Sequence, residues 1–420
     1  MSHAMGAVFT PEQVALLKQR FFANIQNNGG IIASPSQHKP DYYYDWVRDS
    51  AISMGLIETW YESTYSELYK SYLYRYVTWT KNIQNQQDSL PGHDILGEPK
   101  FYIDGTPFAG PWGRPQNDGP AIRATVLTRF AQQLLDQQNI DYVQSHLYNQ
   151  TMTPVTMGVI KTDLEYIAHH WHEINFDLWE EISGHHFFTA MVQKKALMDG
   201  AHLAKRLNDV SAAVFYENQA QLIDERLAEH IDYENQLIQA TLPPHSNPQK
   251  TYELDSAVIL AVLMNPQPEG PFSPQHELVK NTVKNLHQQF NEMFPINKNA
   301  RGAILFGRYP GDTYDGYHTT GKGNPWFILT ATMAEYYFTL ADNLSNTLEN
   351  QSQINKYLTK GDSYLKLIKK YAPEMYLSEQ INLNTGNQQG AYSLTWSYVS
   401  VLRALDLREK VQKKITATIS

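Results

Sequence analysis

Three carboxylates lie within five consecutive residues beside a tryptophan, in the stretch Asp177-Leu178-Trp179-Glu180-Glu181. Burial against an indole and repulsion between like charges both raise the pKa of a carboxyl group. A carboxyl group of this kind can donate a proton at neutral or mildly acidic pH, so the stretch is a candidate for general acid catalysis. The alternative is an acidic first turn of a helix, where Asp and Glu interact favourably with the helix dipole.

A further carboxylate, Glu379, lies far along the chain among small and polar residues. A buried acid beside Trp179 and a distant, more polar carboxylate would make an acid and base pair for glycoside hydrolysis. One carboxyl group protonates the leaving oxygen, and the other attacks the sugar or activates water. Inversion at the sugar needs a separation of roughly 6.5–9.5 Å, which holds that water.

Three charged residues are candidates for binding the hydroxyl groups of a neutral sugar, namely Arg48, Asp49 and Arg308. Guanidinium forks and carboxylates bond well to pairs of hydroxyl groups. The alternative is a structural salt bridge at the base of a loop. The chain is also rich in aromatic residues, with 27 Tyr and 8 Trp, and aromatic faces cover the apolar faces of sugars, although most of these rings must serve ordinary packing.

The composition argues against several classes of function. The net charge is −9 at pH 7 and no long run of Lys or Arg occurs, which argues against nucleic-acid binding. No Gly-rich phosphate loop of the Walker or dinucleotide type is present, so a neutral substrate fits better than a phosphorylated one. The absence of cysteine excludes disulfides, cysteine zinc sites and a thiol nucleophile.

Metal-dependent and serine-dependent hydrolysis are not predicted either. Histidines cluster in two places, but the spacing of the zinc-protease motif is missing, so we expect neither a catalytic metal nor another cofactor. Ser378 lacks the G-x-S-x-G context of a serine hydrolase. The clustered histidines are His169, His170, His172, His185 and His186.

Hydrophobic periodicity predicts about twelve helices and few strands. Long loops that carry the charged and aromatic motifs alternate with short connections, which suits paired helices in a ring with the long loops at one end. An α-solenoid is the alternative, but no repeat of fixed period is present. The helices are expected near residues 11–27, 52–60, 64–84, 121–136, 154–172, 187–207, 210–230, 253–264, 275–293, 324–340, 353–371 and 394–405.

Helix ends and domain limits can also be predicted. Thr10 should cap the first helix and Asn324 a later one, each followed by proline at the first helical position, and the tail after 410 should fray. No linker divides the 420 residues, so we expect a single catalytic domain over 11–410. Residues 1–10 resemble a disordered tag remnant, so a native signal peptide could be missing. No apolar run approaches the ~20 residues of a membrane span.

Eight motifs, in order over about residues 30 to 400, resemble those of the glucoamylases of glycoside hydrolase family 15, closest to the fungal and yeast type. Each motif is modestly specific by itself, but eight in order are highly specific. The motifs are Trp46-Val47-Arg48-Asp49, Gly97-Glu98-Pro99-Lys100-Phe101, Trp112-Gly113-Arg114-Pro115-Gln116-Asn117-Asp118-Gly119-Pro120, Asp177-Leu178-Trp179-Glu180-Glu181, Gly307-Arg308-Tyr309-Pro310, Gly323-Asn324-Pro325-Trp326, Leu377-Ser378-Glu379-Gln380 and Leu394-Thr395-Trp396-Ser397-Tyr398.

The resemblance implies an all-α fold, an (α/α)6 barrel with long loops that form a pocket at one end. It implies exo-acting, inverting hydrolysis of α-1,4-linked glucose, and slower hydrolysis of α-1,6 bonds, from the non-reducing ends of starch, dextrins and maltooligosaccharides. The product would be β-D-glucose. We also expect a secreted monomer that binds no nucleic acid.

Roles carry over from the family residue by residue. Glu180 would be the general acid and Glu379 the general base. Arg48, Asp49 and Arg308 would bind the terminal glucose and Glu181 the next sugar. Asp177 would orient the acid, and Trp112 would support the leaving-group side. The remaining residues expected to form or brace the pocket are Tyr42, Trp46, Leu178, Trp179, Tyr314, Trp326 and Trp396.

The sequence departs from the family pattern in several respects. The missing cysteines remove the disulfides of many fungal members, and Gly311 stands where an acidic residue is common. The insertion 315–322 lengthens a loop near the pocket, which leaves the preferred chain length open. No starch-binding domain is present, so soluble substrates are expected. Two alternatives stay open: a glucosidase of the glucodextranase or trehalase kind on the same barrel, and a catalytically silent sugar-binding protein.

Overall fold

The computed structural model describes residues 6–151, 153, 156–243 and 254–417. Over these residues the chain forms thirteen α-helices, of which α5 (Ile140–Tyr142) is a single turn. The predicted all-α class is therefore confirmed. The longer helices are α1 (Pro11–Ala23), α2 (Val47–Thr64), α3 (Glu67–Gln84), α4 (Asp118–Asp136), α6 (Gly158–His170), α7 (Phe187–Arg206), α8 (Val210–Ala228), α9 (Ala257–Met264), α10 (Glu277–Met293), α11 (Phe327–Asn343), α12 (Gln351–Tyr371) and α13 (Thr395–Thr416).

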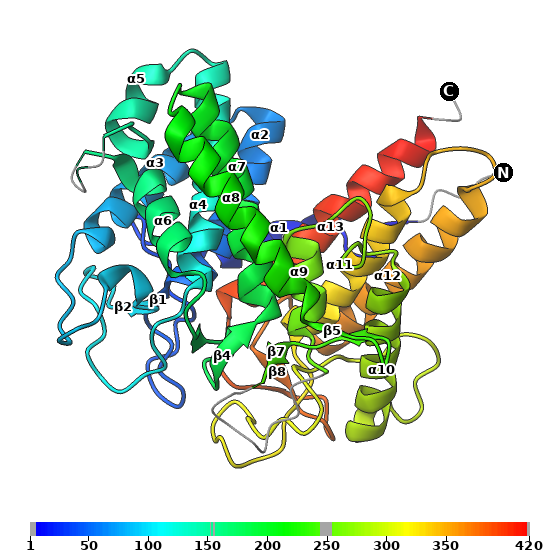
Figure 1. Cartoon of the computed structure of the whole chain (residues 1–420). Coiled ribbons are helices and arrows are strands. Elements are labelled where there is room, and N and C mark those ends of the chain that lie inside the picture. The colour runs from blue at the N-terminus through cyan, green and yellow to red at the C-terminus, as the bar shows by residue number, and fades with distance from the viewer. Residues whose placement is uncertain (1–5, 152, 154–155, 244–253, 418–420) are drawn as a thin grey trace.

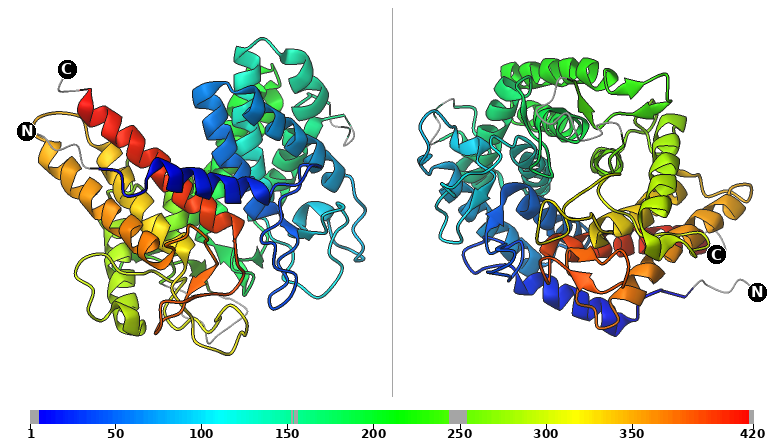
Figure 2. Two further views of the ribbon diagram at one scale, coloured as in Figure 1. Left: turned by 180° about the vertical axis from the view of Figure 1, so that it is seen from behind. Right: turned by 90° about the horizontal axis from the view of Figure 1, so that it is seen from below.

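Six helices form a closed inner ring. α2 packs against α4, α4 against α7, α7 against α9, α9 against α11 and α11 against α13, which closes the ring on α2. The other six, α1, α3, α6, α8, α10 and α12, each pack on the outside of at least one inner helix. The right-hand view of Figure 2 shows the ring end-on. This arrangement is the predicted (α/α)6 barrel, and it brings the first and last parts of the chain into contact.

The distribution of apolar residues explains which helices lie inside. α9 is apolar on almost every side, and seven of its eight residues are buried. α11 buries nearly all of its residues from Phe327 to Leu340. The outer helices α10 and α12 bury one stripe each and expose charged residues on the opposite face. A helix that is apolar all round needs neighbours on every side, whereas an amphipathic helix needs a core on one side only.

Short strands brace the loops that precede the inner helices. They form small antiparallel sheets, most of which lie at the lower end of the molecule in Figure 1. The register pairs Trp46 with Lys100 and Asn175 with Gly184. The pairs are β1 (Asp45–Trp46) with β2 (Lys100–Phe101), β3 (Asn175–Phe176) with β4 (Ser183–His186), β4 with β7 (Thr241–Leu242), β5 (Ile231–Asp232) with β6 (Leu237–Ile238), and β8 (Gln380–Ile381) with β9 (Gln388–Gln389).

The first helix begins where predicted and ends earlier. Thr10 accepts the backbone N–H of Gln13, whose side chain bonds back to Thr10, so the predicted N-cap is confirmed as a full capping box. α1 ends at Ala23 instead of near 27. The chain reverses there, and Ile25 forms an antiparallel bridge with Ile31, which is incompatible with another helical turn.

The predicted cap at Asn324 is wrong. α11 begins at Phe327 with Trp326 as its N-cap. Asn324 instead donates to Gln380 Oε1 at 3.0 Å and accepts the backbone N–H of Leu383 at 3.0 Å. Its side chain therefore ties the loop before α11 to the segment after α12.

The expected fraying after 410 is also wrong. α13 continues to Thr416 because Lys414 Nζ donates to the carbonyl oxygens of Asp342 and Leu344 at 2.6 and 2.8 Å. Two predicted helix starts, at 154 and 253, lie outside the described residues. Within the described part of the chain, no helix is long and apolar enough to cross a membrane.

Candidate active site

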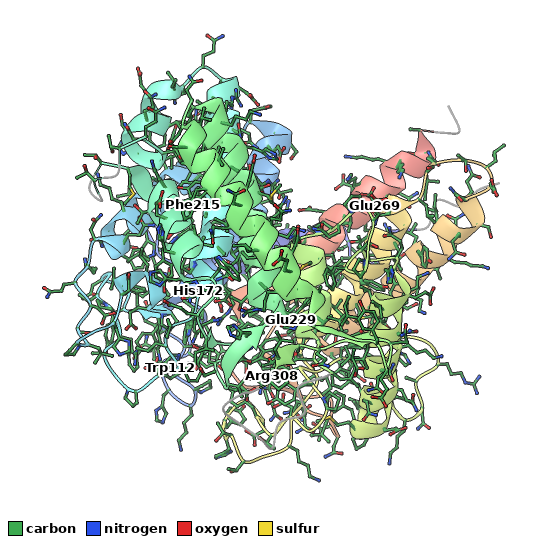
Figure 3. All side chains as sticks on the ribbon, viewed as in Figure 1. Trp112, His172, Phe215, Glu229, Glu269 and Arg308 are labelled. Carbon is green, nitrogen blue, oxygen red and sulfur yellow. The ribbon has the colours of Figure 1, made fainter. Side chains whose placement is uncertain are left out.

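A cavity of about 500 Å³ opens at the end of the ring where the inner helices begin. It takes its lining from the starts of α2 and α13, from the turn between β3 and β4, and from loops before α11 and α13. Figure 3 shows Trp112 and Arg308 at this lower end of the molecule. Residues more than three hundred positions apart thus share one cavity because the ring brings all the inner-helix starts together.

The cavity collects every predicted site residue except Asp177. Glu180 is partly exposed within it, whereas Glu379 is 2% exposed. The predicted residues that line it are Tyr42, Trp46, Arg48, Asp49, Trp112, Leu178, Trp179, Glu180, Glu181, Arg308, Tyr314, Trp326, Glu379 and Trp396.

Asp177 lies beneath the cavity and shapes the turn that carries Glu180. Its Oδ1 accepts the backbone N–H groups of Glu181 at 2.8 Å and Ile182 at 2.9 Å. Glu180 itself has a φ of 65°, a left-handed conformation that costs energy for a residue with a side chain. The acidic stretch is therefore a tight turn between β3 and β4, and the alternative of a helix start is wrong.

Three donors converge on a single oxygen of Glu180. Its Oε2 accepts Trp46 Nε1 at 3.2 Å, Gln116 Nε2 at 2.7 Å and the indole N–H of Trp112. An oxygen that accepts three hydrogen bonds has no room for a proton, so a protonated Glu180 carries its proton on Oε1. The three donors therefore fix the orientation of the Glu180 carboxyl group.

A charged network beside Glu180 begins at α2. Arg48 Nη1 donates to Gln116 Oε1 at 2.9 Å, and Arg48 Nε lies 3.2 Å from Asp49 Oδ1. The Gln116 amide thus joins Arg48 to Glu180. Burial raises the pKa of Asp49 to about 6, although the Arg48 charge opposes this shift. Asp118 also pairs with Arg48, at 3.4 Å, so the guanidinium is held on several sides.

Arg308 is held in a similar way on the other side of the cavity. It forms a two-pronged pair with Asp312, with Nε to Oδ2 at 2.8 Å and Nη2 to Oδ1 at 2.7 Å. Its Nη2 also donates to Glu181 Oε2 at 3.2 Å, and Tyr309 donates to Glu181 Oε1 at 2.7 Å. The sequence has Gly311 where the family commonly has an acidic residue. The next residue, Asp312, provides a carboxylate to Arg308.

Glu379 lies in a buried setting of polar side chains. Gln380 Nε2 donates to its Oε1 at 2.9 Å, and the hydroxyl groups of Tyr42 and Tyr314, which are 2.6 Å apart, also hydrogen-bond to it. Burial raises the pKa of Glu379 to about 7, while these hydrogen bonds and Arg308 oppose the rise. The expected buried acid beside Trp179 is instead partly exposed at Glu180, whereas Glu379 is buried.

Three residues of the site went unassigned in the sequence. Gln116 and Lys100 lie inside motifs that carry the family resemblance. Their positions in these motifs indicate that they belong to the site, but not what they do there. Asp312 follows Arg308 by four residues, a spacing common to many structural ion pairs. The contacts of Gln116 and Lys100 join residues far apart in the sequence, which no local pattern reveals.

Two of the clustered histidines make structural contacts. His186 bonds to Thr241 Oγ1 at 2.9 Å and to the carbonyl oxygen of Asn175 at 2.7 Å, which ties together the small sheet behind the turn at Glu180. His170 lies 3.0 Å from Glu173 at the surface. Among the described residues, no group of three or more His, Asp or Glu side chains is placed to hold a metal ion.

Comparison with known proteins gives a consistent result. The model of glycosyl hydrolases family 15 matches residues 16–406. A glucoamylase of Blastobotrys adeninivorans is 32% identical over 96% of this chain and 71% of its own length. A probable glucoamylase of Schizosaccharomyces pombe is 34% identical over 93% of this chain and 87% of its own. The solved glucoamylase of Saccharomycopsis fibuligera superposes with a TM-score of 0.85 at 28% identity, covering 95% of this chain and 94% of that one.

Proposed function

The chain belongs to glycosyl hydrolase family 15, and from this premise we propose that it is a glucoamylase. It removes single glucose units from the non-reducing ends of α-glucans, cutting α-1,4 bonds and, more slowly, α-1,6 bonds, with inversion to β-D-glucose. The observation that carries the proposal is the gathering of Glu180, Glu379, Arg48, Asp49 and Arg308 around one cavity.

In this proposal Glu180 is the general acid. Its Oε1 delivers a proton to the glycosidic oxygen as the bond to the sugar breaks. The three donors on Oε2 then stabilise the carboxylate that this transfer creates. Trp112 and Gln116 therefore contribute most after the proton has begun to move, which lowers the barrier and not merely the energy of the bound substrate.

Glu379 is the general base. It takes a proton from the water that attacks the anomeric carbon, on the face opposite the leaving group. The hydroxyl groups of Tyr42 and Tyr314 and the Gln380 amide hold its carboxylate in place. The raised pKa of Glu379 and the donors on Glu180 alone would suggest the reverse assignment. The position of Glu180 in the Leu-Trp-Glu-Glu motif supports our assignment, and the test of leaving groups described in the Discussion separates the two.

The other cavity residues bind sugar. Arg308 and Asp49 offer a guanidinium and a carboxylate to the hydroxyl groups of the terminal glucose, together with Arg48. Glu181, whose side chain Arg308 and Tyr309 hold, faces the second sugar. Aromatic rings brace this set, since the Trp179 ring centroid lies 5.7 Å from that of Trp326 and 6.1 Å from that of Trp396.

The decisive experiment follows the anomers released from maltotriose by proton NMR. We expect β-glucose to appear first and α-glucose to follow only by mutarotation. Initial α-glucose, or no glucose, would overturn the proposal. The same protein on isomaltose and trehalose decides the linkage, with maltose expected to be the faster substrate.

We further propose that the protein is a secreted monomer. Family membership leaves both points open, because one relative, from Saccharomyces cerevisiae, is named an intracellular sporulation-specific glucoamylase and is 30% identical over 92% of this chain. Light scattering of the purified protein measures its mass in solution. Activity in culture medium compared with washed cells measures its location.

A further inference from the structure

Lys100 occupies an unusual position beside the cavity. It lies in β2 directly opposite Trp46 of β1, is 4% exposed, and forms part of the cavity wall. Among the described residues no carboxylate forms a salt bridge with it. A buried ammonium group without an anion is costly, so something else must stabilise it here.

Aromatic rings surround the ammonium group. Lys100 Nζ lies 3.6 Å from the ring centroid of Trp112, 4.0 Å from Phe108, 4.2 Å from Tyr44 and 5.0 Å from Trp46. These distances are within the range of cation–π attraction, which is strongest for Trp and for groups shielded from water. Burial lowers the pKa of Lys100 to about 8, while the charge of Glu180 opposes the shift. Lys100 is thus a cation at neutral and acidic pH.

Two of these four rings also contact Glu180. The indole N–H groups of Trp46 and Trp112 both donate to Glu180 Oε2. A cation over the face of an indole draws electron density from the ring, so the N–H at its edge becomes a stronger donor. Coupled hydrogen-bonding groups in a site of low dielectric strengthen one another in this way.

Lys100 is also in direct contact with the ring of Trp112. Trp112 is 37% exposed and has open space on one side. The Trp112 ring packs edge-on against Phe108, with 5.8 Å between ring centroids. It also lies at a tilt to Trp46, with 6.2 Å between centroids. The closest cation contact in this group is the one between Lys100 and Trp112.

We propose that Lys100 is a positioning residue for proton donation: it orients Trp112 and Trp46 on Glu180 and, through them, stabilises the carboxylate that forms as the leaving oxygen is protonated. This inference rests on the proposed function. It deepens that function, because it assigns to Lys100 a role that no contact with substrate requires.

The test compares substrates that need a proton with substrates that do not. Maltotriose releases a sugar alkoxide unless it is protonated, whereas p-nitrophenyl α-D-glucopyranoside releases a stable phenolate. In Lys100→Met, which keeps an unbranched side chain one atom shorter and removes the charge, we expect kcat on maltotriose to fall roughly ten- to thirtyfold, the size of a desolvated cation–π contact. On the aryl glucoside we expect a loss of less than about threefold.

Three controls make the result specific. Lys100→Arg keeps a cation in the aromatic cage and should restore the wild-type ratio of the two rates, even if both rates are lower. Lys18→Met removes a lysine that lies over Trp60 at 4.9 Å, away from the cavity, and should leave both rates unchanged. In a Glu180→Gln background, Lys100→Met should cause no further loss on maltotriose, because coupled residues are not additive.

The outcomes test the role of Lys100 and the proposed function separately. Equal losses on both substrates, full activity in Lys100→Met, or an additive loss in the double variant would overturn the role of Lys100 and leave the proposed function intact. A wild-type protein that releases no glucose from maltotriose would overturn the proposed function, and the role of Lys100 with it.

Discussion

The carboxylate of Asp177 accepts the backbone N–H of Glu181 at 2.8 Å, and this bond holds the turn from which Glu180 projects. The neighbouring N–H of Ile182 reaches the same oxygen at 2.9 Å. One buried side chain therefore fixes two backbone groups next to a residue in the left-handed region. The geometry of the acid depends on a residue that does not line the cavity.

We predict that Asp177→Ala lowers kcat at least tenfold and changes KM little. The substitution leaves two buried backbone donors without an acceptor, at a cost of about 1–3 kcal/mol each, and the turn at Glu180 relaxes. Asp177→Asn keeps an acceptor oxygen and is the matched variant, so it should retain more activity and a higher melting temperature. Steady-state kinetics and calorimetry on both variants test this, and equal behaviour of the two would contradict it.

The proposed roles of Glu180 and Glu379 predict different responses to the leaving group. Glu180→Gln should lose roughly 10²–10⁴-fold on maltotriose but far less on an aryl glucoside, which leaves without a proton. Glu379→Gln should lose a similar factor on both substrates, because each needs activated water. The reverse pattern would exchange the two roles.

Asp312→Asn should weaken binding of the terminal glucose. The change removes the anion from a bidentate pair and leaves Arg308 buried with Glu181 as its remaining carboxylate. Breaking one side of a buried pair typically costs about 3–5 kcal/mol. We expect a lower melting temperature and a fall of at least tenfold in kcat/KM. Asp315→Asn, in the nearby loop, is the control and should have little effect on either quantity.

As the pH is lowered, activity should decline at a higher pH than it would if the general base were a solvent-exposed glutamate. A general base must be deprotonated, and burial raises the pKa of Glu379 to about 7, so kcat/KM should fall as the pH drops through that value. Tyr42→Phe removes a hydrogen-bond donor that lowers the pKa of Glu379. The acid limb of the pH profile, where activity falls with decreasing pH, should therefore move to higher pH. A pH profile of kcat/KM for maltotriose measures both, since it reports groups of the free enzyme. An acid limb near pH 4.5 in both proteins would contradict the prediction.

Glu58, which is buried in the second half of α2, should make stability depend on pH. Burial raises its pKa to about 7, against an ordinary value of 4.5, despite the charge of Arg129. Between these values the folded protein binds a proton that the unfolded chain does not, so the free energy of unfolding falls as pH rises from about 4.5 to 7.

In Glu58→Gln the side chain is neutral at every pH. The free energy of unfolding should therefore depend less steeply on pH. Glu62→Gln removes a half-exposed carboxylate on the same Arg129 whose charge adds to the shift at Glu58, so it should reduce the slope less than Glu58→Gln does. Denaturant unfolding at several pH values between 4.5 and 8 gives the slopes. Identical slopes for Glu58→Gln and the wild type would refute the prediction.

The sequence predicts the ring well and the chemistry of the site only in part. Helical periodicity reports which residues face a core, so the order of the helices is readable and the barrel follows. The setting of Glu379 is not readable, because Tyr42 and Tyr314 reach it from other parts of the ring. The same limit hides Asn324, because its partner Gln380 is distant in sequence and outweighs its ordinary preference for a helix start.

Some roles become visible only when distances are known. Gln116 is one polar residue in a motif of nine, yet its amide joins Arg48 to Glu180. Lys100 carries no local pattern that distinguishes it from a surface lysine. The roles of Gln116 and Lys100 both depend on tertiary contacts. The energies of such contacts are set by burial and not by spacing along the chain.

The contact between α13 and α2 has a consequence for biosynthesis. A ring that closes between its first and last inner helices consists of contacts between residues far apart in the chain, and high contact order slows folding. On the ribosome, the core cannot be completed before α13 emerges. We expect nascent chains lacking α13 to be sensitive to protease, which pulse proteolysis of stalled chains measures. Trp396 of α13 also lines the cavity, so we expect the enzyme to stay inert until α13 has been translated.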